Sequence, residues 1–447
     1  MTDVKKQENE REICLEILME VMERGAYVHT LLRNVLDKYA YMEKRERSFI
    51  ARLTEGTVEY TIQLDVVINR YSKTKTDKMK PLIRNLLRMS VYQILYMDSV
   101  PDSAVCNEAV KLAVKRKFHG LKGFVNGVLR TIVREKDSIT FNSLSEQYSM
   151  PQWMIDRWIK VYGEETTQKL LAEFLDTKKL YIRCNTSKCT MQQLKESLDR
   201  DNVTYKEAPY IKEALQITGV YMIYELEAFQ DGWFQVQDIS SMLVAKAACP
   251  KTGDTILDLC AAPGGKALHL ADMLDGTGYV EARDLTEYKV DLIQDNIERA
   301  GFDNICAVCS DALEYDEAWK EKADIVIADL PCSGLGVIGK KMDIKYKTMP
   351  EHITELQKLQ REILFNAARY VKQGGIVIYS TCTIAKEENE DNYKWIKDEL
   401  GLEPVSLKGC DGFDMEEESL ESGYIQLLPG MHQTDGFFIA KFKKIAK

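Results

Sequence analysis

The pattern of hydrophobic and polar positions changes twice along the chain. Up to about residue 140, apolar residues recur at spacings of three and four, as in "REICLEILMEVMERGAYVHTLLRNVL" and "MKPLIRNLLRMSVYQILYM". This period places the apolar side chains on one face of a helix. Short polar connections separate these segments, so we expect residues 1–140 to form an all-α bundle.

A second pattern occupies residues 141–236. "MPQWMIDRWIKVYG" and "EETTQKLLAEFL" predict two linker helices. Beyond them, "KKLYIRCN" predicts a strand, "TMQQLKESLDRDN" a helix, and "VTYKEAP" and "ALQITG" two more strands. Strand, helix and strand over so short a span predict a small α+β domain, either ferredoxin-like or RNA-recognition-like.

In residues 237–447, strands and helices alternate. The predicted strands are "DTILDLC", "GYVEARD", "NICAVCSD", "ADIVIADLP" and "GGIVIYST". Helices such as "EYKVDLIQDNIERAG" separate them, and "GYIQLLP" and "DGFFIAKFKK" predict two late strands that complete or edge the sheet. Such alternation predicts a parallel sheet covered by helices on both faces, a Rossmann-like α/β domain. The chain is therefore expected to be multidomain.

Composition agrees with a folded chain of several domains. The 447 residues are too many for one hydrophobic core, and the 45% hydrophobic and 29% charged content is ordinary. The apolar runs are too short to span a membrane, and the polar start "MTDVKKQENEREI" predicts no signal peptide. Eleven scattered cysteines favour reduced thiols in the cytoplasm over a disulfide framework. Cys306 and Cys309 form an isolated CxxC, for which we expect a strand rather than a metal site.

Charge is uneven along the chain. Residues 1–140 carry 25 Lys and Arg against 19 Asp and Glu, whereas the whole chain has a net charge of −10. Clustered basic residues favour a partner with a phosphate backbone. A single cluster of this kind more often only solvates a helix face.

A glycine-rich turn follows the first strand of the α/β region. In "ILDLCAAPGGKALHLA", Pro263, Gly264 and Gly265 allow the backbone to turn tightly and to approach a ligand closely. The spacing matches neither G-x-G-x-x-G nor the P-loop motif, which makes a dinucleotide or a nucleoside triphosphate a weak prediction.

Aspartates end the next three strands. Asp284, Asp311 and Asp329 follow the second, third and fourth strands. Each alone could simply cap a helix. Together with the glycine-rich turn they fit a nucleoside cofactor without pyrophosphate, such as S-adenosylmethionine, with Asp284 on the ribose and Asp311 on the adenine amine.

Two cysteines follow the last two strands of the alternating series. Cys332 lies in "ADLPCSGLGVIG" and Cys382 in "STCTIAKEENE". If the sheet order is the usual one for nucleotide-binding folds, both loops open over the cofactor crevice. A thiolate that adds to C6 of cytosine makes C5 nucleophilic toward a methyl sulfonium, which is a use for such a thiol. Asp329 could hydrogen-bond the cytosine edge. For either cysteine alone, a small buried residue is the usual interpretation.

The sequence around Cys382 suggests what could favour ionisation of its thiol. A thiolate is favoured by a helix N-terminus directly after the cysteine, by the sulfonium or by a nearby lysine. Glu387, Glu388 and Glu390 are predicted to cap that helix.

These segments carry a family resemblance. "DLCAAPGGK", "DLPCSGLG" and "STCTIAKEENE" resemble motifs I, IV and VI of the RNA 5-methylcytosine methyltransferases of the NOL1/NOP2/Sun family. The match runs from Gln237 to the C-terminus and includes "TDGFFIAKF". The N-terminal helices are similar to the antitermination factor NusB. The three parts in this order resemble the bacterial 16S rRNA methyltransferases of the RsmB (Sun, Fmu) type over nearly the whole chain.

The resemblance implies a role for each candidate residue. Cys382 is implied as the nucleophile, Cys332 as the group that assists proton loss or enzyme release, and Lys266 and Asp329 as groups beside the target base. The residues implied to hold S-adenosylmethionine are Cys260, Ala261, Ala262, Pro263, Gly264, Gly265, Lys266, Asp284, Asp311 and Asp329. The implied partner is naked or partly assembled 16S rRNA, and the implied product is 5-methylcytosine at a cytidine conventionally numbered 967.

One segment departs from the family pattern. In "GKKMDIKYK", Met342 stands where the family tends to have a proline. We expect Lys340, Lys341 and Lys345 to remain able to contact phosphates.

Three other functions are weighed against this one. A non-catalytic RNA-binding factor would not need the cofactor loop and both cysteines. An S-adenosylmethionine enzyme acting on protein or a small molecule needs no paired thiols. An enzyme that methylates tRNA or another rRNA site shares the catalytic motifs, and only the NusB-like bundle argues for 16S rRNA. Nothing in the sequence requires a metal, a membrane or a dimer, so a monomer is expected.

Overall fold

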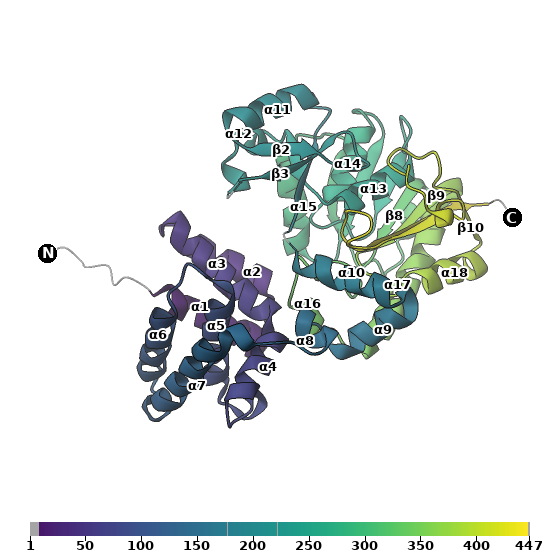
Figure 1. Ribbon diagram of the computed structural model, residues 1–447. Coiled ribbons are helices and arrows are strands. Elements are labelled where there is room, and N and C mark those ends of the chain that lie inside the picture. Colours follow the sequence, from purple (N-terminus) through teal and green to yellow (C-terminus); the bar gives the residue numbers. More distant parts are fainter. Residues whose placement is uncertain (1–8, 177, 221, 446–447) are drawn as a thin grey trace. The chain divides into compact units, whose positions relative to one another are not determined.

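The computed structural model describes residues 9–176, 178–220 and 222–445. It divides into two compact units, residues 1–175 with 340–347, and residues 176–339 with 348–447 (Figure 1). The domain boundaries at 140 and 236 stay predictions. In the described residues, no helix is both long enough and apolar enough to cross a membrane.

The first unit is built from α-helices, as the spacing of its apolar residues predicts. Its helices are α1 (Glu10–Arg24), α2 (Val28–Lys38), α3 (Lys44–Glu59), α4 (Thr61–Tyr71), α5 (Pro81–Tyr96), α6 (Asp102–Lys115), α7 (Lys122–Glu135), α8 (Leu144–Tyr148), α9 (Gln152–Tyr162) and α10 (Glu164–Leu175). Asn9 caps α1, and Pro81 begins α5, where a missing N–H is harmless. Helix α5 is buried over most of its length and forms the centre of the bundle.

Residues 340–347, which the chain reaches only after most of the α/β sheet, pack into this helical unit. Met342 joins its hydrophobic core, and α16 (Ile344–Lys347) follows. The Asp343 carboxylate accepts a hydrogen bond from the Val28 N–H at the start of α2, where no other side chain caps the helix. The Lys345 ammonium donates to the Glu59 carbonyl at the end of α3. The negative Asp343 carboxylate therefore lies at the N-terminus of α2, and the positive Lys345 ammonium lies at the C-terminus of α3. Each charge is favourable beside the partial charge of that helix end.

This packing corrects one expectation from the sequence. Lys345 is 2% exposed and its ammonium is hydrogen-bonded within the helical unit, so it cannot contact a phosphate as predicted. Met342, at the position where the family tends to have proline, is a core residue of the bundle. A core contact of this kind links residues that are far apart in sequence, so the local pattern of hydrophobic and polar positions does not predict it.

The small α+β domain has the ferredoxin-like arrangement. Its elements are β1 (Leu180–Cys184), α11 (Met191–Arg200), β2 (Thr204–Glu207), β3 (Ala214–Thr218), α12 (Glu227–Gln230) and β4 (Phe234–Val236). The strand order is β2-β3-β1-β4, and all pairs are antiparallel. The predicted ferredoxin-like alternative is confirmed.

The α/β domain contains a mixed sheet. Its elements are α13 (Ile239–Ala248), β5 (Thr255–Asp258), α14 (Gly265–Met273), β6 (Tyr279–Asp284), α15 (Glu287–Ala300), β7 (Ile305–Cys309), β8 (Ala323–Asp329), α17 (Pro350–Tyr370), β9 (Val371–Thr381), α18 (Glu390–Glu399), β10 (Leu402–Pro404), β11 (Tyr424–Leu427) and β12 (Phe437–Lys444). The order is β10-β12-β9-β8-β5-β6-β7, and β11 pairs with β12. Strands β5 to β9 are parallel, and β12 runs antiparallel to β9.

Helices cover both faces of this sheet (Figure 1). Helices α13, α14 and α15 bury one face, and α17 and α18 bury the other. From β5 the chain proceeds through β6 to β7, then returns to place β8 and β9 on the other side of β5. The strand order thus reverses between β5 and β8. In open α/β sheets, ligands bind at the carboxyl ends of the strands at such a point.

A buried ion pair joins the ferredoxin-like domain to α14. Arg183 of β1 lies 3.1 Å from the Asp272 carboxylate of α14, and their side chains are 2% and 3% exposed. The backbone N–H groups of Thr186 and Ser187 donate to the same carboxylate at 3.1 and 2.9 Å. A buried carboxylate with this many donors is fully compensated. The helix that follows the glycine-rich turn is therefore held to the ferredoxin-like domain near its C-terminal end.

Candidate active site

The candidate residues gather at one edge of the sheet. Asp284, Asp329 and Cys382 lie at or just beyond the carboxyl ends of β6, β8 and β9, and the glycine-rich turn follows β5. Asp329 pairs in register with Ser380 one strand over. Residues spread over about 120 positions of sequence are brought together because parallel strands end at a common edge.

The glycine-rich turn is a rigid cradle. Gly264 has φ = 103°, a conformation that residues with a Cβ rarely adopt, and it precedes α14. The Ala261 N–H donates to the Arg283 carbonyl at 2.7 Å, and the Asn296 amide donates to the Pro263 carbonyl at 3.0 Å. These contacts tie the turn to β6 and α15.

Asp284 and Asp311 both have local partners. The Asp284 carboxylate accepts hydrogen bonds from the Ala262 N–H at 3.0 Å and from the Lys289 ammonium at 2.9 Å. Asp311 accepts from the Leu313 N–H at 2.9 Å, as expected of a turn-capping residue. Each carboxylate has four acceptor positions, so these contacts leave capacity for a ligand. Their roles toward ribose and adenine stay predictions.

Asp258, at the end of β5, was not singled out from the sequence. Asp258 is completely buried. Within the described part of the chain, no donor forms a hydrogen bond of normal geometry with either oxygen of its carboxylate. Burial raises the pKa of Asp258 to about 7, although the neighbouring Lys266 ammonium opposes that shift. A buried carboxylate with so few polar contacts is costly. The observation fits a site that a cationic group completes, and the amino group of S-adenosylmethionine is such a group.

Lys266 and Asp329 form an ion pair beside the thiols. The Lys266 ammonium lies 2.7 Å from the Asp329 carboxylate, which also accepts a hydrogen bond from the Ser380 hydroxyl at 2.8 Å. Burial opposes the charge on Lys266, but Asp329, Asp258 and the Cys382 thiol together raise the pKa of Lys266 above its ordinary value. The lysine is therefore a fixed cation close to Cys382.

The structure brings Cys332 and Cys382 into contact. Their sulfur atoms are 3.3 Å apart, and both residues are partly exposed. Hydrogen bonding between the thiols raises the pKa of Cys332 well above its ordinary value, and burial adds to the shift. The Cys332 thiol therefore holds its proton firmly. Either thiol can be the donor in the contact between the two sulfurs.

Of the acidic residues predicted to cap the helix after Cys382, Glu390 lies in the first turn of α18, but Glu388 has a different role. The next helix, α18, begins only at Glu390, so no helix N-terminus lies directly behind the Cys382 thiol. Glu388 is completely buried and accepts hydrogen bonds from the Ser333 N–H at 3.0 Å and the Gln360 amide at 2.9 Å. It also accepts a hydrogen bond from the Ser333 hydroxyl. Its carboxylate therefore fixes the loop that carries Cys332.

Two glycines allow that loop to touch the start of β12. The Gly436 N–H donates to the Gly336 carbonyl at 2.9 Å, and the Gly336 N–H donates to the Cys382 carbonyl at 3.1 Å. A Cβ on Gly336 would lie 1.9 Å from the Gly436 carbonyl oxygen. Only glycine fits there, and the contact links the backbones of all three segments around the thiols.

The CxxC cysteines lie on β7, as predicted. Cys309 is exposed and Cys306 partly so, which places them on a less buried strand than expected, because β7 is the outer strand of the sheet. Among the described residues, no group of three or more His, Cys, Asp or Glu is placed to hold a metal ion.

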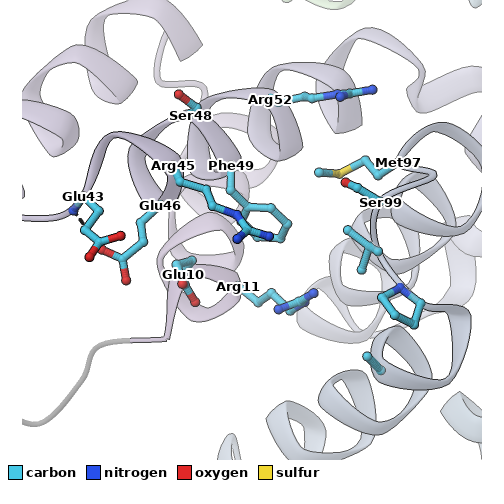
Figure 2. Close-up of a pocket in the computed structure, with 13 residues that line it drawn as sticks. Glu10, Arg11, Glu43, Arg45, Glu46, Ser48, Phe49, Arg52, Met97 and Ser99 are labelled. Carbon is cyan, nitrogen blue, oxygen red and sulfur yellow. Dashed lines mark hydrogen bonds between the residues drawn. The ribbon is translucent and has the colours of Figure 1, made fainter.

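The helical unit has a cavity of its own, of about 550 Å³. Figure 2 shows Arg11 and Arg45 extending beside the ring of Phe49, and the Arg11 guanidinium lies 4.9 Å from the ring centroid. Acidic residues also line the cavity, namely Glu10, Glu43 and Glu46. The basic and acidic residues that line the cavity are equal in number, so the cavity does not have the positive charge that a phosphate-binding site needs. RNA binding by the basic bundle stays a prediction.

Comparisons with known proteins agree with this architecture. The family model for the 16S rRNA methyltransferase RsmB/F matches residues 245–443, the NusB family model residues 8–134, and the RsmF/B-like ferredoxin-like domain model residues 150–223. The probable ribosomal RNA small subunit methyltransferase B of Bacillus subtilis is 34% identical, over 98% of this chain and 99% of its own.

Two further relatives extend the likeness over the full chain. The ribosomal RNA small subunit methyltransferase B of Escherichia coli is 30% identical, over 99% of this chain and 100% of its own. The crystal structure of a protein designated PH0851 is 28% identical, covers 97% of this chain and 98% of its own, and superposes with a TM-score of 0.82. The chain therefore belongs to the RsmB/F family of 16S rRNA methyltransferases, with a NusB-like domain and a ferredoxin-like domain ahead of the methyltransferase domain.

Proposed function

We propose that this methyltransferase methylates C5 of a cytidine in 16S rRNA, with Cys382 as the covalent nucleophile. The observation that carries the proposal is the contact between the two thiols at the carboxyl edge of the sheet, beside Lys266 and Asp329. Methylation at other positions of a nucleotide has no use for a paired thiol. C5 of cytosine needs one because the ring carbon is a poor nucleophile until C6 is attacked.

S-adenosylmethionine supplies an electrophilic methyl group when it is bound. The cradle at 260–266 and the buried Asp258 carboxylate are the features that would hold it, with Asp258 facing its cationic amino group and Asp284 its ribose. An Asp258→Asn variant should weaken cofactor binding in calorimetry and leave RNA binding unchanged. Equal cofactor affinity in the variant and the parent would remove Asp258 from the site.

The residues around the thiols divide the remaining steps. The Cys382 sulfur adds to C6, and Lys266 stabilises the thiolate because its ammonium is held nearby by Asp329. Asp329 is placed to hydrogen-bond the cytosine edge. After methyl transfer the proton on C5 must leave, and the C6–S bond then breaks. Cys332 is the thiol in contact with Cys382, so it assists these last steps.

The target base must leave its stack to reach the Cys382 sulfur, which favours a cytidine in a loop. The proposed position is the cytidine conventionally numbered 967, on naked or partly assembled small-subunit RNA. The basic helical unit is proposed to hold the RNA backbone.

The chemistry is tested with RNA that carries tritium at C5 of cytidine. Methylation at C5 releases one tritium into water for each methyl group transferred, whereas methylation at a nitrogen or at a ribose oxygen releases none. The Cys382→Ala variant serves as the control and should release no tritium. Methyl incorporation by the parent chain without tritium release would sink the proposal.

The position is tested by bisulfite sequencing of RNA from a strain that lacks the gene. One protected cytosine of 16S rRNA should become convertible, and the intact gene should restore its protection. If the change falls in tRNA or at another rRNA site instead, the catalytic chemistry stands and the substrate assignment falls.

A further inference from the structure

A second pair of cysteines lies outside the site described above. Cys249 ends α13, and Cys410 lies in the loop between β10 and β11. Their sulfur atoms are 3.2 Å apart, although 161 positions separate them in sequence. Cys249 is exposed and Cys410 is buried.

The buried ammonium of Lys441 rests on both sulfurs. Lys441, on β12, is 6% exposed, and its Nζ lies 3.4 Å from the Cys249 sulfur and 3.5 Å from the Cys410 sulfur. Within the described residues, these two sulfurs are its only hydrogen-bonding partners, and no carboxylate lies within ion-pair distance of it. A buried ammonium is stable only beside a partner that can carry negative charge. A thiolate shared by the two sulfurs is such a partner.

Other charged groups near the pair are already neutralised. The Lys246 ammonium lies 2.9 Å from the Asp411 carboxylate and also pairs with Glu213. Hydrogen bonding with the Cys410 thiol lowers the pKa of Cys249 to about 6, burial opposes that shift, and the Lys441 charge supports it. The Cys249 S–H donates to the Lys246 carbonyl at 3.1 Å and lies 3.2 Å from the Cys410 sulfur, so its proton is the one that Lys441 helps to release. Hydrogen bonding to Cys249 and burial raise the pKa of Cys410, so the Cys410 thiol holds its proton more firmly.

We propose that Cys249 and Cys410 form a peroxide-sensitive dithiol, in which Cys249 reacts first and Cys410 closes a reversible disulfide. The oxidant is a hydroperoxide. The Cys249 thiolate attacks one peroxide oxygen, so an S–O bond forms, the O–O bond breaks, and the leaving oxygen takes a proton. The product is a sulfenic acid on Cys249.

The second step resolves this sulfenic acid. Cys410 attacks the Cys249 sulfur, the S–S bond forms, the S–O bond breaks, and the departing hydroxide leaves as water with the Cys410 proton. With hydrogen peroxide, the two thiols lose two electrons in total and the peroxide becomes two waters. A disulfide has an S–S distance of about 2.05 Å, so the sulfurs need to approach by only about 1 Å.

The molecule contains a matched comparison for this pair. Cys184 and Cys189 also have neighbouring sulfurs, 3.6 Å apart, but both are buried and neither contacts an ammonium. If sulfur proximity alone decided oxidation, both pairs would close at similar rates. If exposure and the Lys441 cation decide it, only the Cys249–Cys410 pair closes at low peroxide.

The test uses the full-length reduced chain, treated with a few equivalents of hydrogen peroxide at pH 7 and then alkylated and digested without reductant. Mass spectrometry should find a peptide linking Cys249 to Cys410 well before any link between Cys184 and Cys189, and dithiothreitol should remove it. Oxidation of the buried pair first, or absence of the link while other thiols oxidise, would overturn the proposal.

Three variants separate the roles of the neighbours. Cys410→Ser should leave a sulfenic acid on Cys249 that dimedone captures, because no resolving thiol remains. Lys441→Met should slow formation of the link severalfold, and Lys441→Arg should restore part of the rate. No dimedone adduct on Cys249 in the Cys410→Ser variant would contradict the order of reaction, and an unchanged rate in Lys441→Met would contradict the role of the cation.

Discussion

Two of the thiol pairs in the second unit have almost the same sulfur spacing and different surroundings. The sulfur atoms of Cys332 and Cys382 are 3.3 Å apart, and those of Cys249 and Cys410 are 3.2 Å apart. The first pair lies at the carboxyl edge of the sheet, and its cation, Lys266, is paired with a carboxylate. The second pair contacts its cation directly.

This difference teaches that sulfur spacing does not define what a thiol pair does. Around Cys332, buried hydrogen bonds from Ser333 and Gln360 to Glu388 hold the loop, so the thiols keep one position relative to a substrate. Around Cys249, the sulfur is exposed and charge-stabilised, which favours attack on a small oxidant. A site for a large substrate needs fixed loops, and a site for a peroxide needs access.

The largest expected contrast is in methyl transfer. Cys382→Ser should lower the methylation rate on the order of 10⁴-fold or more, because removal of a covalent nucleophile removes the reaction path. Cys249→Ser should leave the rate within about twofold, since it lies outside the catalytic site. Transfer of a labelled methyl group to 16S rRNA measures both. A normal rate in Cys382→Ser would assign the nucleophile elsewhere.

The next contrast concerns the covalent intermediate. Cys332→Ser should accumulate a protein–RNA adduct, because the group that assists release is lost, and turnover should fall by roughly 10²- to 10⁴-fold. Cys410→Ser should accumulate none. A denaturing gel with labelled RNA shows the adduct as a slowly migrating band. A clean lane for Cys332→Ser would count against its release role.

A third contrast is the pH dependence of alkylation. Since the thiolate is the reacting form, the iodoacetamide reaction of Cys249 should rise with pH around a midpoint near the pKa of about 6. Lys441→Met and Cys410→Ala should each move that midpoint upward, toward the value of about 8.5 of an ordinary thiol. Peptide mass spectrometry across pH 5 to 9 gives the midpoint. If the midpoint is unchanged in both variants, neither Lys441 nor Cys410 sets the pKa of Cys249.

The smallest contrast is in stability. Glu388→Gln should lower the free energy of unfolding by about 1–3 kcal/mol, because an amide N–H₂ then faces buried donors. Asp411→Asn, beside the second pair, should change it by less than about 0.5 kcal/mol because that carboxylate is half exposed. Urea unfolding compares the two. An equal decrease in the free energy of unfolding for both variants would mean that the Cys332 loop is held no more firmly than the loop that carries Asp411.

The order of elements could be predicted from the sequence because it depends on local periodicity. Strands β5 to β9, the late strands β11 and β12, and the ferredoxin-like unit all follow from alternation of apolar and polar positions and from turn residues. The positions of Cys332 and Cys382 could also be predicted, since loops after parallel strands open at one edge of such a sheet, and the structure brings their sulfurs into contact. Their catalytic roles stay a proposal.

The buried polar residues could not be predicted in this way. Glu388 looked like a helix cap because it stands in an acidic run, and its partners, Ser333 and Gln360, are 55 and 28 positions away. Asp258 looked like part of a strand, and the proximity of Cys249 to Cys410 depends on how α13 packs against the loop after β10. Each role depends on tertiary contacts, which a local pattern does not contain.

The packing of residues 340–347 against the N-terminal helices complicates any deletion of those helices. Met342 and Tyr346 pack against side chains of the first 140 residues, so a truncated protein without these residues would expose both side chains to water as an apolar surface prone to aggregation. Loss of RNA affinity after such a deletion could then reflect aggregation instead of a missing RNA contact. Point substitutions of exposed lysines and arginines on the helices are the informative route to the RNA footprint.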